Sequence, residues 1–163
     1  MTRFNSFMDE AIKEAKKALK NNEVPVGAVI VDGNTNSIIA RSGNRNISDK
    51  DPTAHSEMVV IRDAAKKLNS HRLDNCDIYI TLEPCSMCAS AISLARIRRV
   101  YYGASDKKFG AIEGGAKIYE QKSCHHKPEI YGEIKSVECA KILQNFFKIK
   151  RDREQKSSKS IIF

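Results

Sequence analysis

A strand, a helix and a second strand follow one another within residues 77–102, and this succession constrains the fold most. Residues 77–82 are mostly β-branched or aromatic, residues 85–97 leave room for a helix, and residues 99–102 end in Val-Tyr-Tyr. Two strands joined by so short a helical connection lie parallel in one sheet, with the helix across its face. The sequence therefore predicts an α/β fold.

The N-terminal part predicts a helix and a hairpin. Residues 4–20 have apolar side chains at helical spacing and lysines on the other face. The apolar positions are Phe4, Phe7, Met8, Ala11, Ile12, Ala15 and Leu19. Residues 24–31 form an apolar, β-branched run, residues 32–34 read Asp-Gly-Asn, and residues 37–40 supply a partner strand. We expect a hairpin there, followed by a polar loop.

Two further helices complete the layout. Thr53 is the expected N-cap of a helix with an apolar stripe at Met58, Val59, Ile61, Ala65 and Leu68. Residues 104–128 predict mostly irregular structure, and a last helix begins near Ser136. We expect one domain over residues 1–151, a small sheet with helices on both faces, and a basic, disordered tail over residues 152–163.

Two short motifs carry the chemistry. The first is His55-Ser56-Glu57 and the second is Pro84-Cys85-Ser86-Met87-Cys88, each at an expected helix start. Together they match the H-x-E and P-C-x-x-C pattern of zinc nucleobase deaminases. A catalytic zinc ion takes three protein ligands and leaves one tetrahedral position to water. His55, Cys85 and Cys88 supply those ligands, and helix N-termini favour the thiolates.

Glu57 is the expected acid–base residue. It lies two positions from His55, about 200° around an ideal helix, so the two side chains do not face the metal in the same way. Zinc lowers the pKa of bound water towards ~7, and Glu57 then carries the water proton to the ring nitrogen and on to the departing ammonia. The Glu83 side chain or backbone and the main chain near Ala54 are further substrate-contact candidates.

Other interpretations of these residues are weaker. A Cys-x-x-Cys alone is more typical of a redox site or structural zinc, and a lone His-x-Glu is typical of a solvated surface. A closed structural site needs a fourth protein ligand, and the sequence has no second Cys-x-x-Cys. His125 and His126 lack a cysteine at metal spacing. The combined motifs therefore favour a catalytic zinc ion.

Charge and cysteine content bear on partners and compartment. Lys and Arg outnumber Asp and Glu by 28 to 20, which fits either a polyanionic partner or a solvated basic surface. The five cysteines are odd in number and do not form a disulfide pattern, which favours a reducing cytoplasm. No run reaches the roughly 18 apolar residues of a membrane span. Phe147, Lys150 and Arg151 combine an aromatic ring with cations, as unpaired nucleotide loops require.

The sequence resembles the bacterial tRNA-specific adenosine deaminases over nearly its whole length, except for the final tail. The resemblance rests on residues 21–29, 43–45, 51–57, 81–88 and 98–104, on Asp106 and Gly110, and on Phe146-Phe147. It implies a three-layer α/β/α cytidine deaminase-like fold with a mixed sheet of about five strands. It implies a homodimer with one zinc ion per subunit, held by His55, Cys85 and Cys88 beside the proton shuttle Glu57.

The resemblance also implies the substrate and its contacts. The expected reaction converts the wobble adenosine of an arginine tRNA to inosine, with the anticodon stem-loop as partner. Asn44 matches a base-contacting position and Asp106 a position near the ribose, although by themselves these residues indicate a turn amide and a solvated loop carboxylate. The chain departs from the family at Ser56, which replaces the usual Ala, at His125, and in the basic segment 148–151.

Two other functions compete with this interpretation. A deaminase of free bases or nucleotides, such as guanine or cytosine, would use the same metal site. A non-catalytic RNA-binding subunit would keep zinc for folding, but such a subunit is expected to lose the carboxylate that this chain retains as Glu57.

Overall fold

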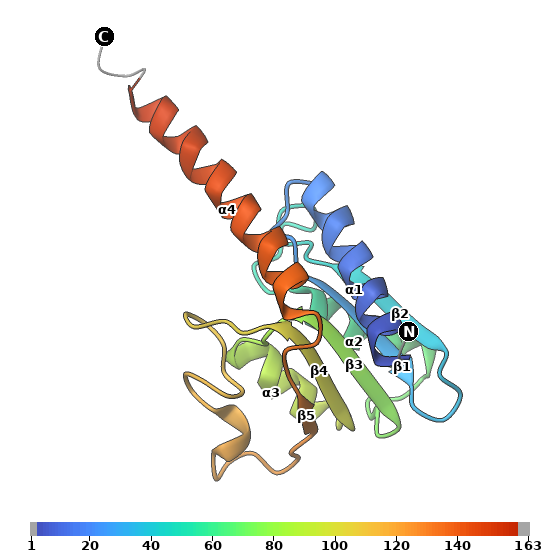
Figure 1. Cartoon of the computed structure of the whole chain (residues 1–163). Helices are drawn as coiled ribbons and strands as arrows, with labels where there is room; N and C mark the ends of the chain where they lie inside the picture. Colours follow the sequence, from blue (N-terminus) through green and yellow to red (C-terminus); the bar gives the residue numbers. More distant parts are fainter. Residues whose placement is uncertain (1–2, 160–163) are drawn as a thin grey trace.

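The computed structural model of the chain describes residues 3–159, and the side chains of residues 7–157. Its elements are α1 (Arg3–Lys20), β1 (Gly27–Asp32), β2 (Ile38–Gly43), α2 (Ser56–Lys67), β3 (Cys76–Leu82), α3 (Ser86–Leu94), β4 (Arg99–Ala104), the 3-10 turn η1 (Ile118–Glu120), β5 (Glu129–Tyr131) and α4 (Ser136–Lys159) (Figure 1). The side chain of Phe4, expected on the apolar face of the first helix, lies outside the described part of the chain. Residues 160–163 of the expected tail also lie outside it.

One mixed sheet of five strands forms the middle of the molecule, in the order β2-β1-β3-β4-β5. β1 pairs antiparallel with both β2 and β3, so the predicted hairpin is confirmed. β3 pairs parallel with β4, as the strand–helix–strand succession predicts, and β4 pairs parallel with β5. The carboxyl ends of β3 and β4 therefore lie at the same edge of the sheet, where open α/β sheets bind ligands.

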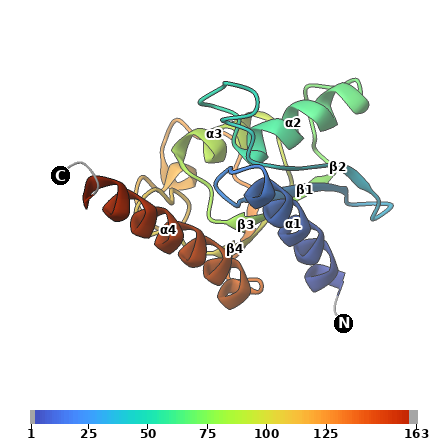
Figure 2. The ribbon, with the colours of Figure 1, turned by 90° about the horizontal axis from the view of Figure 1, so that it is seen from above.

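Helices cover both faces of the sheet, which confirms the three-layer arrangement (Figure 2). Successive side chains of a strand point to opposite faces. Ile78 and Ile80 of β3 join the core that contains side chains of α2 and α3, whereas Tyr79 between them joins the core that contains side chains of α1 and α4. Each face of the sheet thus has its own apolar core.

Gly27 at the start of β1 allows α1 to lie directly on the sheet. A Cβ atom built at this position would lie 2.0 Å from the carbonyl oxygen of Ala11 and 2.5 Å from the amide nitrogen of Ala15. No side chain fits in that space, so the close approach of helix and strand requires glycine here.

Helix starts and apolar stripes differ in detail from the sequence expectations. Thr53 is not the N-cap of α2: its amide and hydroxyl both donate to Oδ1 of Asp51, in a turn that precedes the helix. The N-cap is His55. Of the expected apolar stripe, Val59 is buried, Met58, Ile61 and Ala65 are partly buried, and Leu68, the C-cap, is exposed. Val60 and Ala64 are the fully buried apolar positions of α2.

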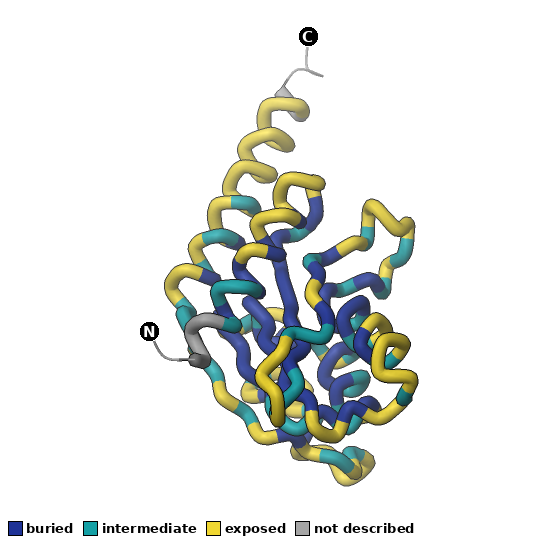
Figure 3. The backbone as a smooth tube through the Cα atoms, turned by 90° about the vertical axis from the view of Figure 1, so that its right-hand side faces the viewer, coloured by how far each residue is buried: buried dark blue, intermediate teal, exposed yellow. Residues whose placement is uncertain are grey.

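The expected disordered tail is wrong for residues 152–159, which belong to α4. The sequence after Gly132 has no glycine or proline, and its Lys, Arg, Glu and Gln residues are good helix formers. The second half of α4 projects away from the body of the protein (Figure 1), and its side chains are exposed as far as they are described (Figure 3). Only the first half of α4 packs on the sheet.

Candidate active site

His55, Cys85 and Cys88 come together although thirty residues separate the two motifs. Nδ1 of His55 lies 3.6 Å from Sγ of Cys85 and 3.5 Å from Sγ of Cys88. One ligand atom from each residue lies within 4.8 Å of the other two. The three residues form a compact set of donors at the edge of the sheet where β3 ends, as the motifs predict.

Two of these residues occupy N-cap positions. His55 precedes α2 and Cys85 precedes α3, both with extended backbone and neither with a side-chain capping hydrogen bond. His55 and Glu57 are therefore not separated by the expected 200° around one helix, because His55 lies outside the helix. Both helices begin at this group, and the partial positive charge of a helix N-terminus stabilises thiolates.

The donor set has the chemistry that a zinc ion requires. Hydrogen bonds from Cys88 and from His55 lower the pKa of the Cys85 thiol to about 4. One imidazole and two thiolates are typical zinc ligands, and three protein ligands leave one of four tetrahedral positions for water or substrate. Within residues 3–159, this is the single group of three or more such side chains close enough to share an ion.

Glu57 lies in the first turn of α2, next to the metal ligands in sequence and in space. Its side chain is buried, and this burial raises the pKa of the carboxyl group, while the charge of nearby His55 acts in the opposite direction. The hydroxyl of Ser56 donates to Oε2 of Glu57 at 3.0 Å. A buried carboxyl with a raised pKa beside a metal site is suited to general acid–base catalysis.

Asn44 and Ala54 lie beside this group. Oδ1 of Asn44 accepts the amide of Ser56 at 2.8 Å and so fixes the start of α2. The carbonyl of Ala54 accepts the amide of Arg45 at 2.9 Å, which joins the two ends of the loop between β2 and α2. The Asn44 oxygen thus has a structural partner, whereas no hydrogen bond found among the described residues uses its Nδ2 group.

Glu83 and Asp106 organise the loop after β4. The buried carboxylate of Glu83 accepts backbone amides of Asp106 at 3.0 Å, Ile112 at 3.2 Å and Glu113 at 3.0 Å, with that of Gly114 at 3.5 Å. Oδ1 of Asp106 accepts two further amides within the loop. Both side chains therefore fix the path of the loop that pairs with Cys85 through Gly110, which for Glu83 is a structural role beyond the expected substrate contact.

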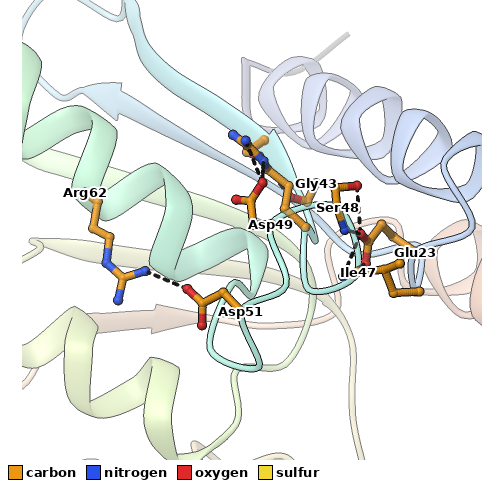
Figure 4. Close-up of polar contacts among 9 residues, drawn as sticks. Glu23, Gly43, Ile47, Ser48, Asp49, Asp51 and Arg62 are labelled. Atoms are coloured by element: carbon orange, nitrogen blue, oxygen red, sulfur yellow. Dashed lines mark hydrogen bonds and ion pairs between the residues drawn. The ribbon is translucent and has the colours of Figure 1, made fainter.

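A second buried glutamate does the same for the loop between β2 and α2 (Figure 4). The Glu23 carboxylate accepts the amide of Ile47 at 2.9 Å and both the amide and the hydroxyl of Ser48, at 2.8 and 3.0 Å. An ion pair of 3.8 Å joins Asp51 at the end of this loop to Arg62 of α2. The role of Glu23 was not predicted from the sequence, because a glutamate between a polar turn and a strand has no pattern that indicates burial.

Comparisons with known proteins agree with this geometry. The family described as "Cytidine and deoxycytidylate deaminase zinc-binding region" matches residues 1–104. A tRNA-specific adenosine deaminase of Agrobacterium fabrum is 52% identical over 146 residues, 89% of this chain and 94% of that protein. One from Bacillus subtilis is 38% identical over 161 residues, 99% of each chain. The chain belongs to the tRNA-specific adenosine deaminase family, within the cytidine and deoxycytidylate deaminases.

Solved structures support the same placement. A structure from work on A-to-I editing by tRNA:A34 deaminases superposes with a TM-score of 0.82 at 51% identity, over 85% of this chain and 99% of that one. A guanine deaminase from Bacillus subtilis gives a TM-score of 0.58 at 39% identity, over 61% and 63%. The fold and the zinc-binding motif expected from the sequence are confirmed.

The departures from the family pattern have distinct surroundings. Ser56 is fully buried and its hydroxyl contacts Glu57, so this substitution adds a hydrogen bond to the site. His125 is exposed, and Nε2 of His126 donates to the carbonyl of Ile97 at 2.6 Å. Neither histidine joins the metal group, in agreement with their spacing.

The expected RNA-binding residues all lie on α4. Phe147, Lys150 and Arg151 are exposed. Phe146 is half-buried and meets Phe147 edge to face, with ring centroids 5.2 Å apart. All five cysteines are free, and no helix of residues 3–159 has the length and apolarity to cross a membrane.

Proposed function

We propose that this protein deaminates adenosine to inosine at the wobble position of tRNA. The observation that carries the proposal is the convergence of His55, Cys85 and Cys88 beside the buried Glu57, in a chain whose relatives are tRNA-specific adenosine deaminases. Adenosine and water give inosine and ammonia, so the reaction needs a nucleophilic water, a proton carrier and a site that takes the base out of its stack.

The residues of the site divide these tasks. His55, Cys85 and Cys88 hold the zinc ion, which when bound supplies a nucleophile at neutral pH by lowering the pKa of water. Glu57 accepts the proton of the attacking water and passes it to the ring nitrogen beside the reacting carbon. The same carboxyl then takes the second proton from the newly attached hydroxyl group and delivers it to the amino group, which departs as ammonia while the new carbonyl forms. Burial of Glu57 excludes bulk water from this proton transfer.

Residues around the site hold the substrate. The Nδ2 group of Asn44 is positioned to donate to an acceptor on the purine edge, and the main chain at Ala54 lines the same region. Glu83 and Asp106 act by fixing the loop that borders the base and ribose. Phe147, Lys150 and Arg151 on the projecting α4 contact the anticodon stem-loop through stacking and phosphate pairing.

The proposed function also includes an oligomeric state, a cellular compartment and a tRNA substrate. The enzyme works as a homodimer with one zinc ion per subunit, in the cytoplasm, on an arginine tRNA. Residues 1–151 form the deaminase domain, and the basic segment from residue 152 extends its RNA-binding surface. Sedimentation of the zinc-loaded protein tests the dimer, and inosine mapping across all transfer RNAs tests the tRNA.

The deciding experiment supplies transfer RNA, free adenine, free guanine and free cytosine to the zinc-loaded protein. We expect inosine in tRNA and ammonia in equal amounts, and no ammonia from the free bases. Glu57→Gln keeps zinc and fold but lowers turnover by roughly 10²–10⁴-fold, the usual contribution of general acid–base catalysis. Glu120→Gln, on the exposed 3-10 turn, is the matched control and keeps full activity. Ammonia from free bases alone, or an active Glu57→Gln protein, would contradict the proposal.

A further inference from the structure

An exposed aromatic ring lies one residue from the backbone that pairs with a metal ligand. Gly110 forms an isolated β-bridge with Cys85, and the amide of Ala111 donates to the carbonyl of Pro84 at 3.0 Å. These contacts join the loop after β4 to the segment that carries the cysteines. Phe109 immediately precedes Gly110, and its side chain is 63% exposed. The ring is therefore at the border of the site and faces solvent.

The backbone that presents this ring is fixed. Oδ1 of Asp106 accepts the amides of Lys108 at 2.9 Å and Phe109 at 3.0 Å, and the carbonyl of Asp106 accepts the amide of Gly110 at 3.0 Å. The amide of Asp106 is itself held by the buried carboxylate of Glu83. Gly110 has no room for a side chain, because a Cβ atom there would lie 2.5 Å from Oε2 of Glu83. The loop thus holds Phe109 outward on a pre-organised turn.

Lys108 adds a cation to the same place. Its Nζ lies 5.0 Å from the centroid of the Phe109 ring. A single exposed apolar side chain is ordinary on a protein surface. An aromatic ring with an ammonium group beside it, on a rigid loop at the border of a site for a nucleobase, has the two elements that bind a nucleotide: a surface for the base and a charge for the phosphate.

Given the proposed function, we propose that Phe109 stacks on the nucleotide next to the reacting adenosine and that Lys108 pairs with its phosphate. A base that enters a buried site leaves its neighbour in the strand without a stacking partner. A ring at the entrance replaces that partner, so it stabilises the strand only in the conformation in which the adenosine has been extruded. Phe109 is thereby a substrate-binding residue that favours the reactive conformation of the RNA.

The first measurement is steady-state kinetics on an anticodon stem-loop with the full-length, zinc-loaded protein. Stacking of a base on an aromatic side chain corresponds to about 5–150-fold on removal of the ring, so Phe109→Ala raises KM or lowers kcat/KM within that range. Phe109→Trp keeps wild-type kinetics because any flat ring serves. Lys108→Ala reduces the dependence of kcat/KM on salt concentration. Val137→Ala is the control, since this side chain is 81% exposed on the first turn of α4, a helix of the other face of the sheet.

The second measurement identifies the partner base. Stem-loops carrying an abasic nucleotide directly 5′ or directly 3′ of the adenosine are compared in wild-type and Phe109→Ala protein. For one of the two positions, we expect the abasic substrate to lose rate with wild-type protein but no further rate with Phe109→Ala. Additive losses at both positions would overturn the inference, because the ring and the neighbouring base would then act independently.

Two further outcomes separate this inference from the proposed function. If the wild-type protein forms inosine in the intact stem-loop while Phe109→Ala matches it, the stacking role is overturned and the deaminase function stands. If the wild-type protein forms no inosine in RNA, both fall together. A change in the sedimentation coefficient of Phe109→Ala would also overturn the inference, since it would place the ring in a contact between protein chains.

Discussion

Replacement of Glu83 by alanine tests how strongly one buried carboxylate holds the wall of the site. The side chain accepts three backbone amides at 3.0–3.2 Å, from Asp106, Ile112 and Glu113, and a longer fourth. It lies between the end of β3 and the metal-ligating segment, and the loop it holds carries Asp106 and Phe109. Removal of the carboxylate leaves all these donors without their acceptor.

The magnitude follows from the environment of each donor. A hydrogen bond to a charged acceptor contributes about 1.5–3 kcal/mol, and a buried donor left unpaired costs about 1–3 kcal/mol. The Ile112 amide is buried and has no access to water, whereas the other two are partly exposed and recover part of the loss by hydration. We therefore expect Glu83→Ala to lower the free energy of unfolding by about 3–5 kcal/mol. Glu83→Gln keeps one oxygen as an acceptor, and we expect about half of that effect.

Urea unfolding of the zinc-loaded protein measures this difference. With a slope of about 2 kcal/mol per molar urea, the midpoint should fall by about 1.5–2.5 M for Glu83→Ala. Glu120→Ala removes an exposed glutamate with only a 3.8 Å ion pair to Lys117 and should change stability by less than about 0.5 kcal/mol. A loss below about 1 kcal/mol would refute the reasoning, as would loop amides that exchange hydrogen as slowly in the variant as in the wild type.

The remaining predictions concern the metal group and α4. Cys88→Ser should lose bound zinc, as measured by elemental analysis. Cys124→Ser is the control, because Cys124 is outside the metal group, and it should keep one equivalent. Full zinc occupancy in Cys88→Ser would show that the ligand set is wrong. Lys150→Ala with Arg151→Ala should weaken tRNA binding and reduce the slope of log affinity against log salt by about 1–2. Lys66→Ala with Lys67→Ala removes equal charge at the far end of α2 from His55 and is the control; equal slopes for both pairs would exclude α4 from the interface.

The sequence predicts the layers of the fold and the metal group well, because both depend on short-range patterns. Apolar periodicity identifies α1 and the hairpin, and the two motifs lie at chain positions that a parallel β3–α3–β4 unit brings to one edge. β5 has three residues, two of them exposed, so its sequence has no strand pattern. Its pairing with β4 depends on the fold around it.

Other sequence predictions fail where a hydrogen bond in the fold overrides the usual preference of a residue for a helix N-cap or for the surface. Thr53 has the residue type of an N-cap, but its amide and hydroxyl both donate to Asp51, and the N-cap is His55, two residues later. Glu23 and Glu83 are acidic residues that average statistics place at the surface. Their burial depends on backbone amides from loops more than twenty residues away, which no sequence window contains.

The hydrogen bonds from loop amides to the buried Glu23 and Glu83 bear on how the sequence of these two loops can change. Both carboxylates accept main-chain amides, so they fix the backbone of each loop independently of the loop's own side chains. Ile47 and Phe109 point outward from these secured paths. Replacement of these two residues alters what each loop presents to solvent, while the path of its backbone stays the same. Single substitutions at these two exposed positions can therefore change the surface chemistry of each loop, while the backbone hydrogen bonds to Glu23 and Glu83 remain.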